Sequence, residues 1–254
     1  MENIYEVRVY GKNRKTPKNG SRSYWTDINS WKQKRTELVG RSPVTVNVTS
    51  KSATWGKFLS PMFLGPVETY QEGPEKMMAT NVEVAWQYSK VYTHEKNGKE
   101  FRPLWFVGGE GYPNQRWFEW RKNAWANPRF SFTNNEFEEN KSKLRRAFPK
   151  GSKVGFWYWA GKKMDQISAR REIYGRIYSK EVQKTEWFRM LKDILRENDL
   201  LIYDIDGYDY VELGMTPDDT IRDLDHSWGH GLVLSLLLKG IDPTTLSLGE
   251  STHE

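Results

Sequence analysis

Apolar and polar residues alternate in two short segments near the start of the chain. Residues 4–11 (IYEVRVYG) and 42–50 (SPVTVNVTS) place apolar side chains at every second position, which is the period of a half-buried strand. Residues 58–66 (FLSPMFLGP) are mostly apolar, but their two prolines exclude a regular helix or a central strand. We therefore predict a small N-terminal β element followed by a buried irregular segment.

Helical periodicity dominates after this point. Residues 75–92 predict a first strong helix, and residues 152–164 predict a strand or an aromatic loop. Thr216 and Pro217 form a typical helix start, with the hydroxyl as cap and the proline in the first turn. Further helices are expected at 133–148, 165–198 (with a break at Gly175) and 227–240 (ending at Gly240).

Together these elements predict an α+β fold that is predominantly helical. Neither an internal repeat nor a low-complexity linker divides the chain, so we expect a single domain over residues 1–254. Within it, residues 93–163 are expected to be a long aromatic-rich insertion. Residues 12–22 (KNRKTPKNGSR) are expected to be a basic exposed loop, and 241–254 a flexible tail.

Composition and charge narrow the choice of partners. The 254 residues carry a formal net charge of +6, which favours polyanionic partners. The chain holds 12 Trp and 13 Tyr, side chains that stack on nucleobases as readily as they fill a core. It has no cysteine, which excludes disulfides and thiolate metal sites and fits a reducing compartment.

The sequence also bears on localisation. Residues 1–10 are charged and lack the apolar run of a signal peptide. The longest apolar stretch, 232–238 (LVLSLLL), is far shorter than the roughly 20 residues that span a bilayer. We therefore expect a cytoplasmic protein without a membrane partner; its oligomeric state is not predicted.

Several familiar signatures fail. Neither a P-loop, a dinucleotide-binding glycine motif nor G-x-S-x-G occurs. Residues 204–209 (DIDGYD) have their glycine too early for a calcium loop and no Glu at the twelfth position. His226 and His230 have the spacing of zinc ligands on a helix, but Gly229 and Gly231 suit close packing, so hydrogen-bonded histidines are favoured. We predict neither a metal nor a cofactor.

One predicted helix carries an unusual set of polar side chains. Glu83, Gln87 and Lys90 stand at i, i+4 and i+7, so they would share one face of a helix. Their neighbours, including Val84 and Trp86, are apolar or aromatic. Glu and Lys are seldom buried without a partner, so the face is either a plain exposed stripe or a site.

These residues carry a family resemblance. The pattern E-x-x-aromatic-Q-x-x-K, formed by Glu83, Trp86, Gln87 and Lys90, resembles the signature helix of the NADAR (YbiA-like) family. That family's segment reads approximately S-E-H-Y-F-Q-A-Q-K-F. The resemblance implies an α+β NADAR-like fold and an N-glycosidase activity.

Weaker similarities extend over roughly 58–238. Residues 58–66 resemble the family's F-S-N-F-x-P-x-P entry segment, and the stretch 168–198 followed by LLIYD resembles its helix-then-L-x-E portion. This alignment places Asp204 at the family's glutamate and Asp209 at its aspartate. WGHGLVLSLLL resembles the closing helix N-x-L-G-x-x-L-M, with His230 at the asparagine.

The chain also departs from the family pattern. Val84 and Ala85 replace the His and Tyr that follow the family's glutamate. Asp209 is not followed two residues later by Trp-Gly, a pair that occurs only at Trp228–Gly229. The segment 93–163 is long for the family.

The resemblance implies removal of ADP-ribose from guanine or cleavage of riboflavin-pathway intermediates. Such cleavage builds positive charge on the sugar, and a carboxylate near the anomeric carbon stabilises it or activates water. We expect Glu83 and either Asp204 or Asp209 to face that carbon. Lys90 is expected to steer phosphates or ribose hydroxyls or, if desolvated so that its pKa falls, to attack the sugar and form a Schiff base.

The substrate-binding residues follow from the same alignment. Gln87 is expected to orient the substrate, and His230 to hydrogen-bond a diphosphate. Trp86, Trp157 or Trp228 would stack on the base, although for Trp157 and Trp228 a place in the core is the favoured role.

A different class of function remains open, namely a nucleic-acid-binding accessory protein. Residues 116–125 (RWFEWRKNAW) interleave basic and aromatic side chains, which suits single strands. The basic loop 12–22 would add phosphate contacts. Its candidate residues are Arg14, Lys15, Lys18 and Arg22.

Two further functions are alternatives to the N-glycosidase. A NADAR-like scaffold can serve as a binding module for ADP-ribose-type ligands without turnover. A nuclease is the other alternative, because Asp204, Asp206 and Asp209 have the ligand chemistry for magnesium.

Overall fold

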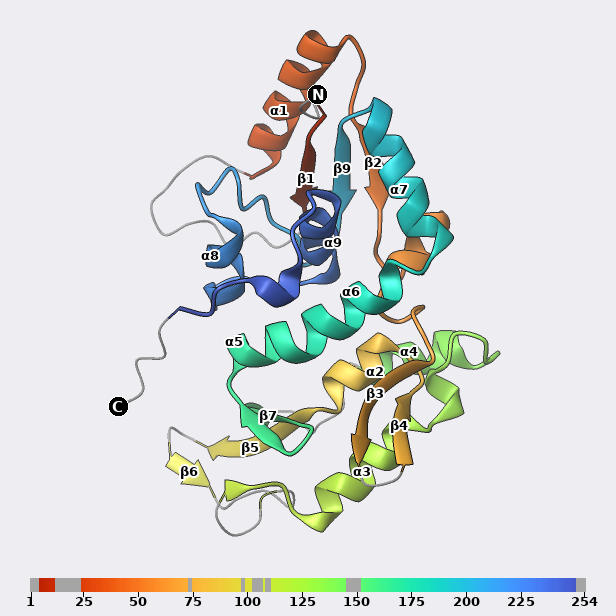
Figure 1. Cartoon of the computed structure of the whole chain (residues 1–254), viewed down its shortest axis with the longest axis vertical. Coiled ribbons are helices and arrows are strands. Elements are labelled where there is room, and N and C mark those ends of the chain that lie inside the picture. Colours follow the sequence, from red (N-terminus) through yellow and green to blue (C-terminus); the bar gives the residue numbers. More distant parts are fainter. Residues whose placement is uncertain are drawn as a thin grey trace. The chain divides into compact units, whose positions relative to one another are not determined.

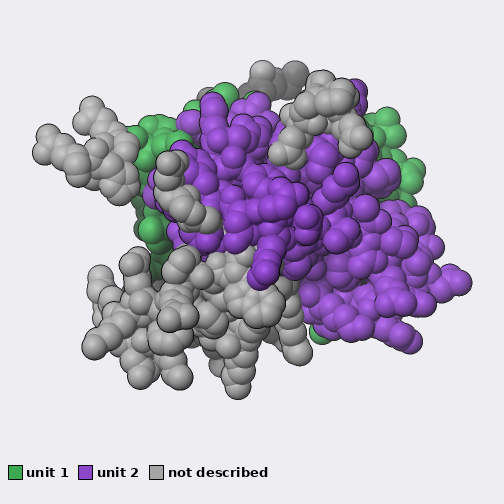
Figure 2. All heavy atoms as spheres, turned by 90° about the horizontal axis from the view of Figure 1, so that it is seen from below, with its two compact units in different colours: residues 1–60, 182–254 green, residues 61–181 purple. Residues whose placement is uncertain are grey.

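The structure of the protein is a computed structural model (Figure 1). It describes residues 5–11, 24–72, 75–96, 99–101, 107, 111–144 and 152–249. The chain divides into two compact units, which Figure 2 colours separately. We call residues 1–60 with 182–254 the terminal unit and residues 61–181 the central unit. The prediction of a single domain stays a prediction, because two compact units can fold together or separately.

A parallel three-stranded sheet forms the centre of the terminal unit. Its order is β1 (Val7–Tyr10), β9 (Leu200–Tyr203), β2 (Val44–Asn47), so the last strand in the chain lies between the first two. Leu200, Leu201 and Ile202 are fully buried. A continuous apolar run is what a strand covered on both faces requires.

Helices flank this sheet (Figure 1). The α9 helix packs against β1 and β9, and because nearly all its side chains are apolar it is buried almost all round. Gly240, with φ +76, follows its end as predicted. The helices of the unit are α1 (Tyr24–Val39), η1 (Trp55–Leu59), α7 (Glu186–Glu197), α8 (Pro217–Arg222), α9 (His230–Leu238) and η5 (Pro243–Thr245).

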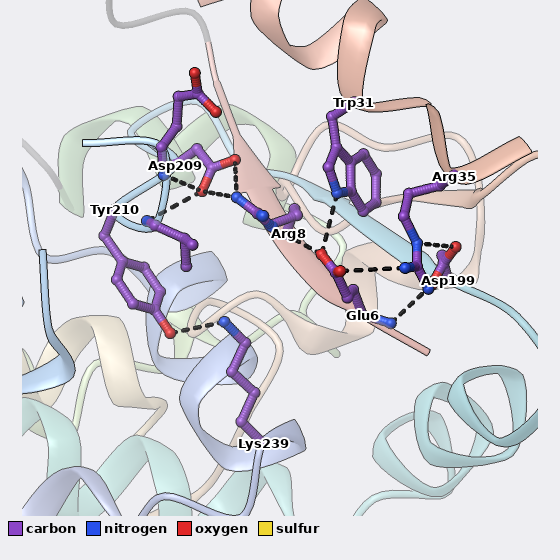
Figure 3. A network of polar contacts seen from close by, with 10 residues as sticks. Glu6, Arg8, Trp31, Arg35, Asp199, Asp209, Tyr210 and Lys239 are labelled. Carbon is purple, nitrogen blue, oxygen red and sulfur yellow. Dashed lines mark hydrogen bonds and ion pairs between the residues drawn. The ribbon is translucent and has the colours of Figure 1, made fainter. Parts of the chain in front are cut away.

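A buried ion-pair network joins helix α1 to this sheet (Figure 3). Arg35 of α1 donates two hydrogen bonds to the Asp199 carboxylate, of 2.8 Å from Nε and 2.7 Å from Nη2. The Glu6 backbone N–H donates to the same carboxylate at 2.7 Å. The Glu6 side chain accepts from Arg35 and from the Trp31 indole. Asp199 therefore fixes both the start of β9 and the position of α1.

The central unit contains two antiparallel sheets. One is the hairpin of β3 (Val67–Glu72) and β4 (Glu75–Ala79). The other has the order β6-β5-β7-β8. Its strands are β5 (Lys90–Lys96), β6 (Lys99–Phe101), β7 (Ser152–Trp159) and β8 (Lys162–Met164).

Short helices connect these strands. They are α2 (Val82–Gln87), α3 (Gln115–Trp125), η3 (Pro128–Phe130), α4 (Phe137–Leu144), α5 (Gln166–Ala169), the π-helical turn η4 (Arg170–Gly175) and α6 (Arg176–Val182). Much of the segment 93–163, predicted to be an insertion, thus supplies strands and helices of the central unit itself.

The structure confirms an α+β fold, the two predicted N-terminal strands and the irregular buried segment 58–66. The capped start at Thr216 is also confirmed, as a full capping box with Asp219. The β structure was underestimated, since it is not confined to an N-terminal element. The predicted break at Gly175 is wrong, because helical turns continue through this residue. The run of helical turns ends at Val182, and the next helix, α7, begins after its cap Thr185.

The prediction of one helix over 75–92 is also wrong. Residues 75–79 pair with β3, and residues 90–96 pair with β7. Only residues 82–87 are helical. The spacing of the apolar residues over 75–92 fits either one long helix or a short helix between two strands. Pairing with β3 and β7 decided in favour of the second arrangement.

The described helices include none with the length and apolar character needed to cross a bilayer.

We expect Asp199→Ala to destabilise the terminal unit strongly. The substitution removes the two-bond partner of the Arg35 guanidinium and the acceptor of the Glu6 N–H, while Arg35 keeps the Glu6 carboxylate, so we expect a loss of about 2–4 kcal/mol. Asp193→Ala is the matched control, because Asp193 pairs with Arg196 on the surface and such pairs contribute roughly 0–1 kcal/mol. Urea unfolding followed by circular dichroism measures both, and equal losses would contradict the role given to Asp199.

Candidate active site

The candidate site begins with the cap of helix α2. The Asn81 side chain accepts a hydrogen bond from Val84 N at 2.9 Å and donates to Phe130 O at 2.7 Å. Asn81 is completely buried, so the cap is anchored in the core of the central unit. The helix therefore starts at Val82 because its first free N–H groups have fixed partners.

The irregular segment before β3 supplies the remaining partners of this helix start. Val82 N donates to Leu64 O at 2.9 Å, and Glu83 N donates to Pro61 O at 3.2 Å. At Gly65, a Cβ would lie 2.3 Å from Thr80 O, so only glycine allows this approach. The apolar segment with two prolines thus positions Glu83.

Glu83, Gln87 and Lys90 form one hydrogen-bonded chain. Gln87 Nε2 donates to Glu83 Oε1 at 3.0 Å, and Lys90 Nζ donates to Gln87 Oε1 at 2.8 Å. The side chain of Glu83 is buried, with 6% of the residue exposed, whereas Gln87 and Lys90 are half-buried. The three predicted residues therefore do meet.

They meet by a different route from the one predicted. Lys90 is not on the helix: α2 ends at Gln87, and Lys90 is the first residue of β5. Ser89 Oγ donates to Trp86 O at 2.8 Å across the turn, and Trp117 Nε1 donates to Lys90 O at 3.0 Å. These two bonds hold the helix-to-strand turn that returns the lysine toward the helix.

Burial changes the acid–base properties of this chain. It lowers the pKa of Lys90 to about 8, against the opposing attraction of Glu83. Burial also raises the pKa of Tyr92 to about 12, with smaller contributions from Tyr88 and Glu83. At pH 7 a pKa of about 8 leaves about a tenth of the Lys90 amine unprotonated, which is the form that acts as a nucleophile.

Tyr92 was not among the predicted site residues. It stands two positions after Lys90 on strand β5 and is buried, with 8% exposed. The strand alternation of KVYTH was the available signal, since residues i and i+2 of a strand share a face. Assigning this segment to a helix concealed it.

Aromatic rings surround the lysine. Lys90 Nζ lies 5.1 Å from the centroid of the Trp86 ring, within range of a cation–π contact. The Trp86 ring stacks on Trp157, with centroids 5.4 Å apart and planes at 26°, and Tyr174 meets Trp86 edge-on at 5.4 Å. Trp86 is half-buried and Trp157 is buried, so a wall of rings borders the amine.

The predicted residues of the chain's later third belong to the terminal unit, and Asp204 is bound there. Its Oδ2 accepts from Gly231 N at 3.0 Å, at the N-terminus of α9. A Cβ on Gly231 would lie 2.6 Å from the Asp204 Cβ, so the glycine permits this contact. His230 Nδ1 lies 3.2 Å from the same oxygen, and His230 Nε2 bonds to Val48 O at 2.8 Å.

Asp209 and Trp228 also have partners within this unit. Arg8 Nη1 donates to both oxygens of Asp209, at 3.1 and 3.2 Å (Figure 3). Val211 N and Glu212 N donate to its Oδ1. Trp228 is 7% exposed, and its indole donates to a threonine of α8. In the terminal unit these groups close turns and cap helices.

Other candidate residues fall outside the described ranges or have a different role. Arg14, Lys15, Lys18 and Arg22 lie outside the residues that the structure describes. His226 Nδ1 bonds to Asp223 Oδ2 at 2.5 Å, which confirms the expectation of a hydrogen-bonded histidine. Within the described ranges, no three His, Asp or Glu side chains gather as ligands for a metal ion.

The basic–aromatic segment 116–125 forms most of helix α3. Trp117, Arg121 and Trp125 are almost completely buried, with 0%, 1% and 1% exposed. The Arg121 guanidinium lies among aromatic rings, 4.7 Å from the centroids of both tryptophans. Most of the aromatic surface expected to stack on a single strand is therefore core.

A scan against protein-family models, a search of curated proteins and a search of solved structures each gave no match. The relationship to the NADAR family therefore stays a prediction from the motif.

We expect Lys90 to make folding stability depend on pH. Between about pH 8 and 10.5 the unfolded chain holds a proton on this amine and the folded protein does not, so stability rises with pH in that window. The free energy of unfolding of the wild type should gain about 2–3 kcal/mol over Lys90→Met between these limits. Urea unfolding at several pH values tests this, and parallel pH profiles would contradict the lowered pKa.

We expect Asp204→Ala to destabilise the terminal unit. The change removes the acceptor for Gly231 N at the start of α9. Because this N–H group is buried and would be left without an acceptor, the free energy of unfolding should fall by about 2–4 kcal/mol. Glu212→Ala, which changes an exposed acidic side chain of the same unit, should change stability by roughly 0.5 kcal/mol or less. Thermal unfolding compares the two variants, and an unchanged Tm for Asp204→Ala would refute the capping role.

Proposed function

We propose that the protein is an N-glycosidase-type hydrolase that cleaves the bond between ribose and base in a nucleotide-like substrate, with ADP-ribose on guanine as the first candidate. One observation carries the proposal. A buried carboxylate, an amide and an amine with a pKa of about 8 stand in a single hydrogen-bonded chain at Glu83, Gln87 and Lys90. Perturbed groups of this kind concentrate at catalytic sites.

The lowered pKa supports the Schiff-base route over a purely electrostatic role for the lysine. At pH 7.5, a pKa of about 8 leaves about a quarter of the Lys90 amine neutral, whereas an ordinary lysine would be almost wholly charged. A neutral amine is a competent nucleophile toward a sugar carbon, and the positive charge that develops on that carbon makes it an electrophile.

The proposed reaction balances with the groups present. Lys90 Nζ forms a bond to C1 of the ribose as the bond from C1 to the base breaks, and the electron pair leaves with the base nitrogen. Nζ loses a proton and the departing base gains one, with Glu83 as the carrier. Opening of the sugar ring gives an imine between Nζ and C1, with the ring oxygen protonated. Water then hydrolyses the imine, releasing the sugar and the amine.

The supporting residues have defined tasks in this scheme. Gln87 donates to Glu83 and accepts from Lys90, so it holds the acid and the amine at a fixed spacing. Trp86 gives the amine an aromatic neighbour. Asp204 and Asp209, predicted to supply a second acid, have no task in this scheme, because it requires Glu83 alone.

We expect Lys90→Arg to abolish turnover, because guanidinium keeps the charge but is not a nucleophile at neutral pH. Glu83→Gln should lower kcat by about 10²–10⁴-fold through loss of the proton carrier. Lys163→Arg is the matched control, since Lys163 is an exposed lysine on β8 that lies over Phe156. The assay is mass spectrometry of ADP-ribose released from an oligonucleotide with ADP-ribosylated guanine.

A trapping experiment separates the two roles of the lysine. Cyanoborohydride added during turnover should reduce the imine and leave the sugar attached at Lys90, as found by peptide mass spectrometry. Turnover without an adduct would point to direct hydrolysis, with water activated by Glu83 and Lys90 steering phosphates. Unchanged turnover in both Lys90→Arg and Glu83→Gln would remove the proposed site.

A further inference from the structure

The indole N–H of Trp157 is a buried donor without a hydrogen-bond partner in the described part of the chain. Trp157 is on β7 and is 6% exposed. Buried polar groups in folded proteins nearly always have a partner, and a lone one carries an unfavourable desolvation cost. An orphaned buried donor therefore calls for an explanation from its surroundings.

The position of Trp157 connects it to the candidate site. In the antiparallel pairing of β5 with β7, Trp157 stands directly opposite Lys90. Directly opposed residues place their side chains on the same face of a sheet, with Cβ atoms about 5 Å apart. The Trp157 ring also stacks on Trp86, whose ring lies beside Lys90 Nζ. Thus the Lys90 amine, the half-buried ring of Trp86 and the buried ring of Trp157, which carries the orphaned donor, are neighbours in one cluster.

Trp125 provides a comparison within the same unit. Its indole nitrogen is likewise buried without a partner among the described residues, and the residue is 1% exposed. Its ring, however, lies against Tyr70 and Trp159 and beside the Arg121 guanidinium, in the core around α3. The two tryptophans therefore share chemistry and burial but differ in whether they adjoin the reactive lysine.

We propose that Trp157 is a specificity-determining residue whose indole N–H donates a hydrogen bond to an acceptor atom on the base of the substrate. This proposal rests on the proposed function for the identity of its ligand. An indole is a neutral donor with no acceptor, so it selects a carbonyl oxygen or an unprotonated ring nitrogen and rejects an N–H edge. The aromatic wall suits a planar neutral group, whereas phosphates are bound mainly by cationic side chains.

The first test observes the donor itself. The protein is labelled with ¹⁵N-tryptophan, the Trp157 indole signal is assigned from Trp157→Phe, and guanosine 5′-monophosphate is added. The Trp157 N–H resonance should move downfield and exchange with water more slowly, while the Trp125 N–H resonance stays in place. A Trp157 signal that does not move at millimolar nucleotide would overturn the proposal.

The second test uses kinetics with a matched pair of variants. Trp157→Phe keeps an aromatic ring and removes the donor, so KM for the ADP-ribosylated guanine oligonucleotide should rise about fivefold, the effect of one neutral hydrogen bond, with kcat nearly unchanged. Trp125→Phe loses the same volume and donor elsewhere and should leave KM unchanged. Equal KM values for the two variants would overturn the role of Trp157.

The two tests keep this proposal separate from the proposed function. If the nucleotide moves the Trp157 resonance but the wild type releases no ADP-ribose, the donor role stands and the N-glycosidase proposal fails. If the wild type turns over but neither the resonance nor KM responds at Trp157, the activity stands and the donor role fails.

Discussion

The candidate site depends on one amide that joins an acid to an amine. Gln87 is the only one of the three residues that can donate to a carboxylate and accept from an ammonium at once, and it does both at hydrogen-bond distance. This geometry requires a helix that ends at Gln87 and a strand that begins at Lys90. The Asn81 cap, the Ser89 turn and the Trp117 bond to Lys90 O meet that requirement.

The pKa of Lys90 is lowered because the amine is buried. Removing an amine from water disfavours its charged form, and the nearby Glu83 offsets only part of that effect. An exposed lysine in the same register would remain protonated and inert as a nucleophile. The rings of Trp86 and Trp157 also supply a planar surface beside the amine.

The terminal unit uses its acidic residues differently. Asp199 binds Arg35 at the start of β9, Asp204 receives an N–H of α9 where that strand ends, and Asp209 binds Arg8 from β1. Each carboxylate thereby ties the central strand or the turn after it to a neighbouring element. Residues that a motif alignment marks as catalytic can be required for the fold, and stability measurements distinguish the two roles.

Sequence alone determined the short alternating strands, the Thr216 cap and the glycine that ends α9, because each depends on local spacing or on side-chain chemistry. It singled out Glu83, Gln87 and Lys90 as a set but placed all three on one helix. It did not determine that 75–92 is strand, helix and strand, since pairing with β3 and β7 is a contact between distant residues. The lowered pKa of Lys90 and the unpartnered indole N–H of Trp157 in the described part of the chain could not be predicted from the sequence either. Those properties arise from burial, and burial is decided only when the whole unit packs.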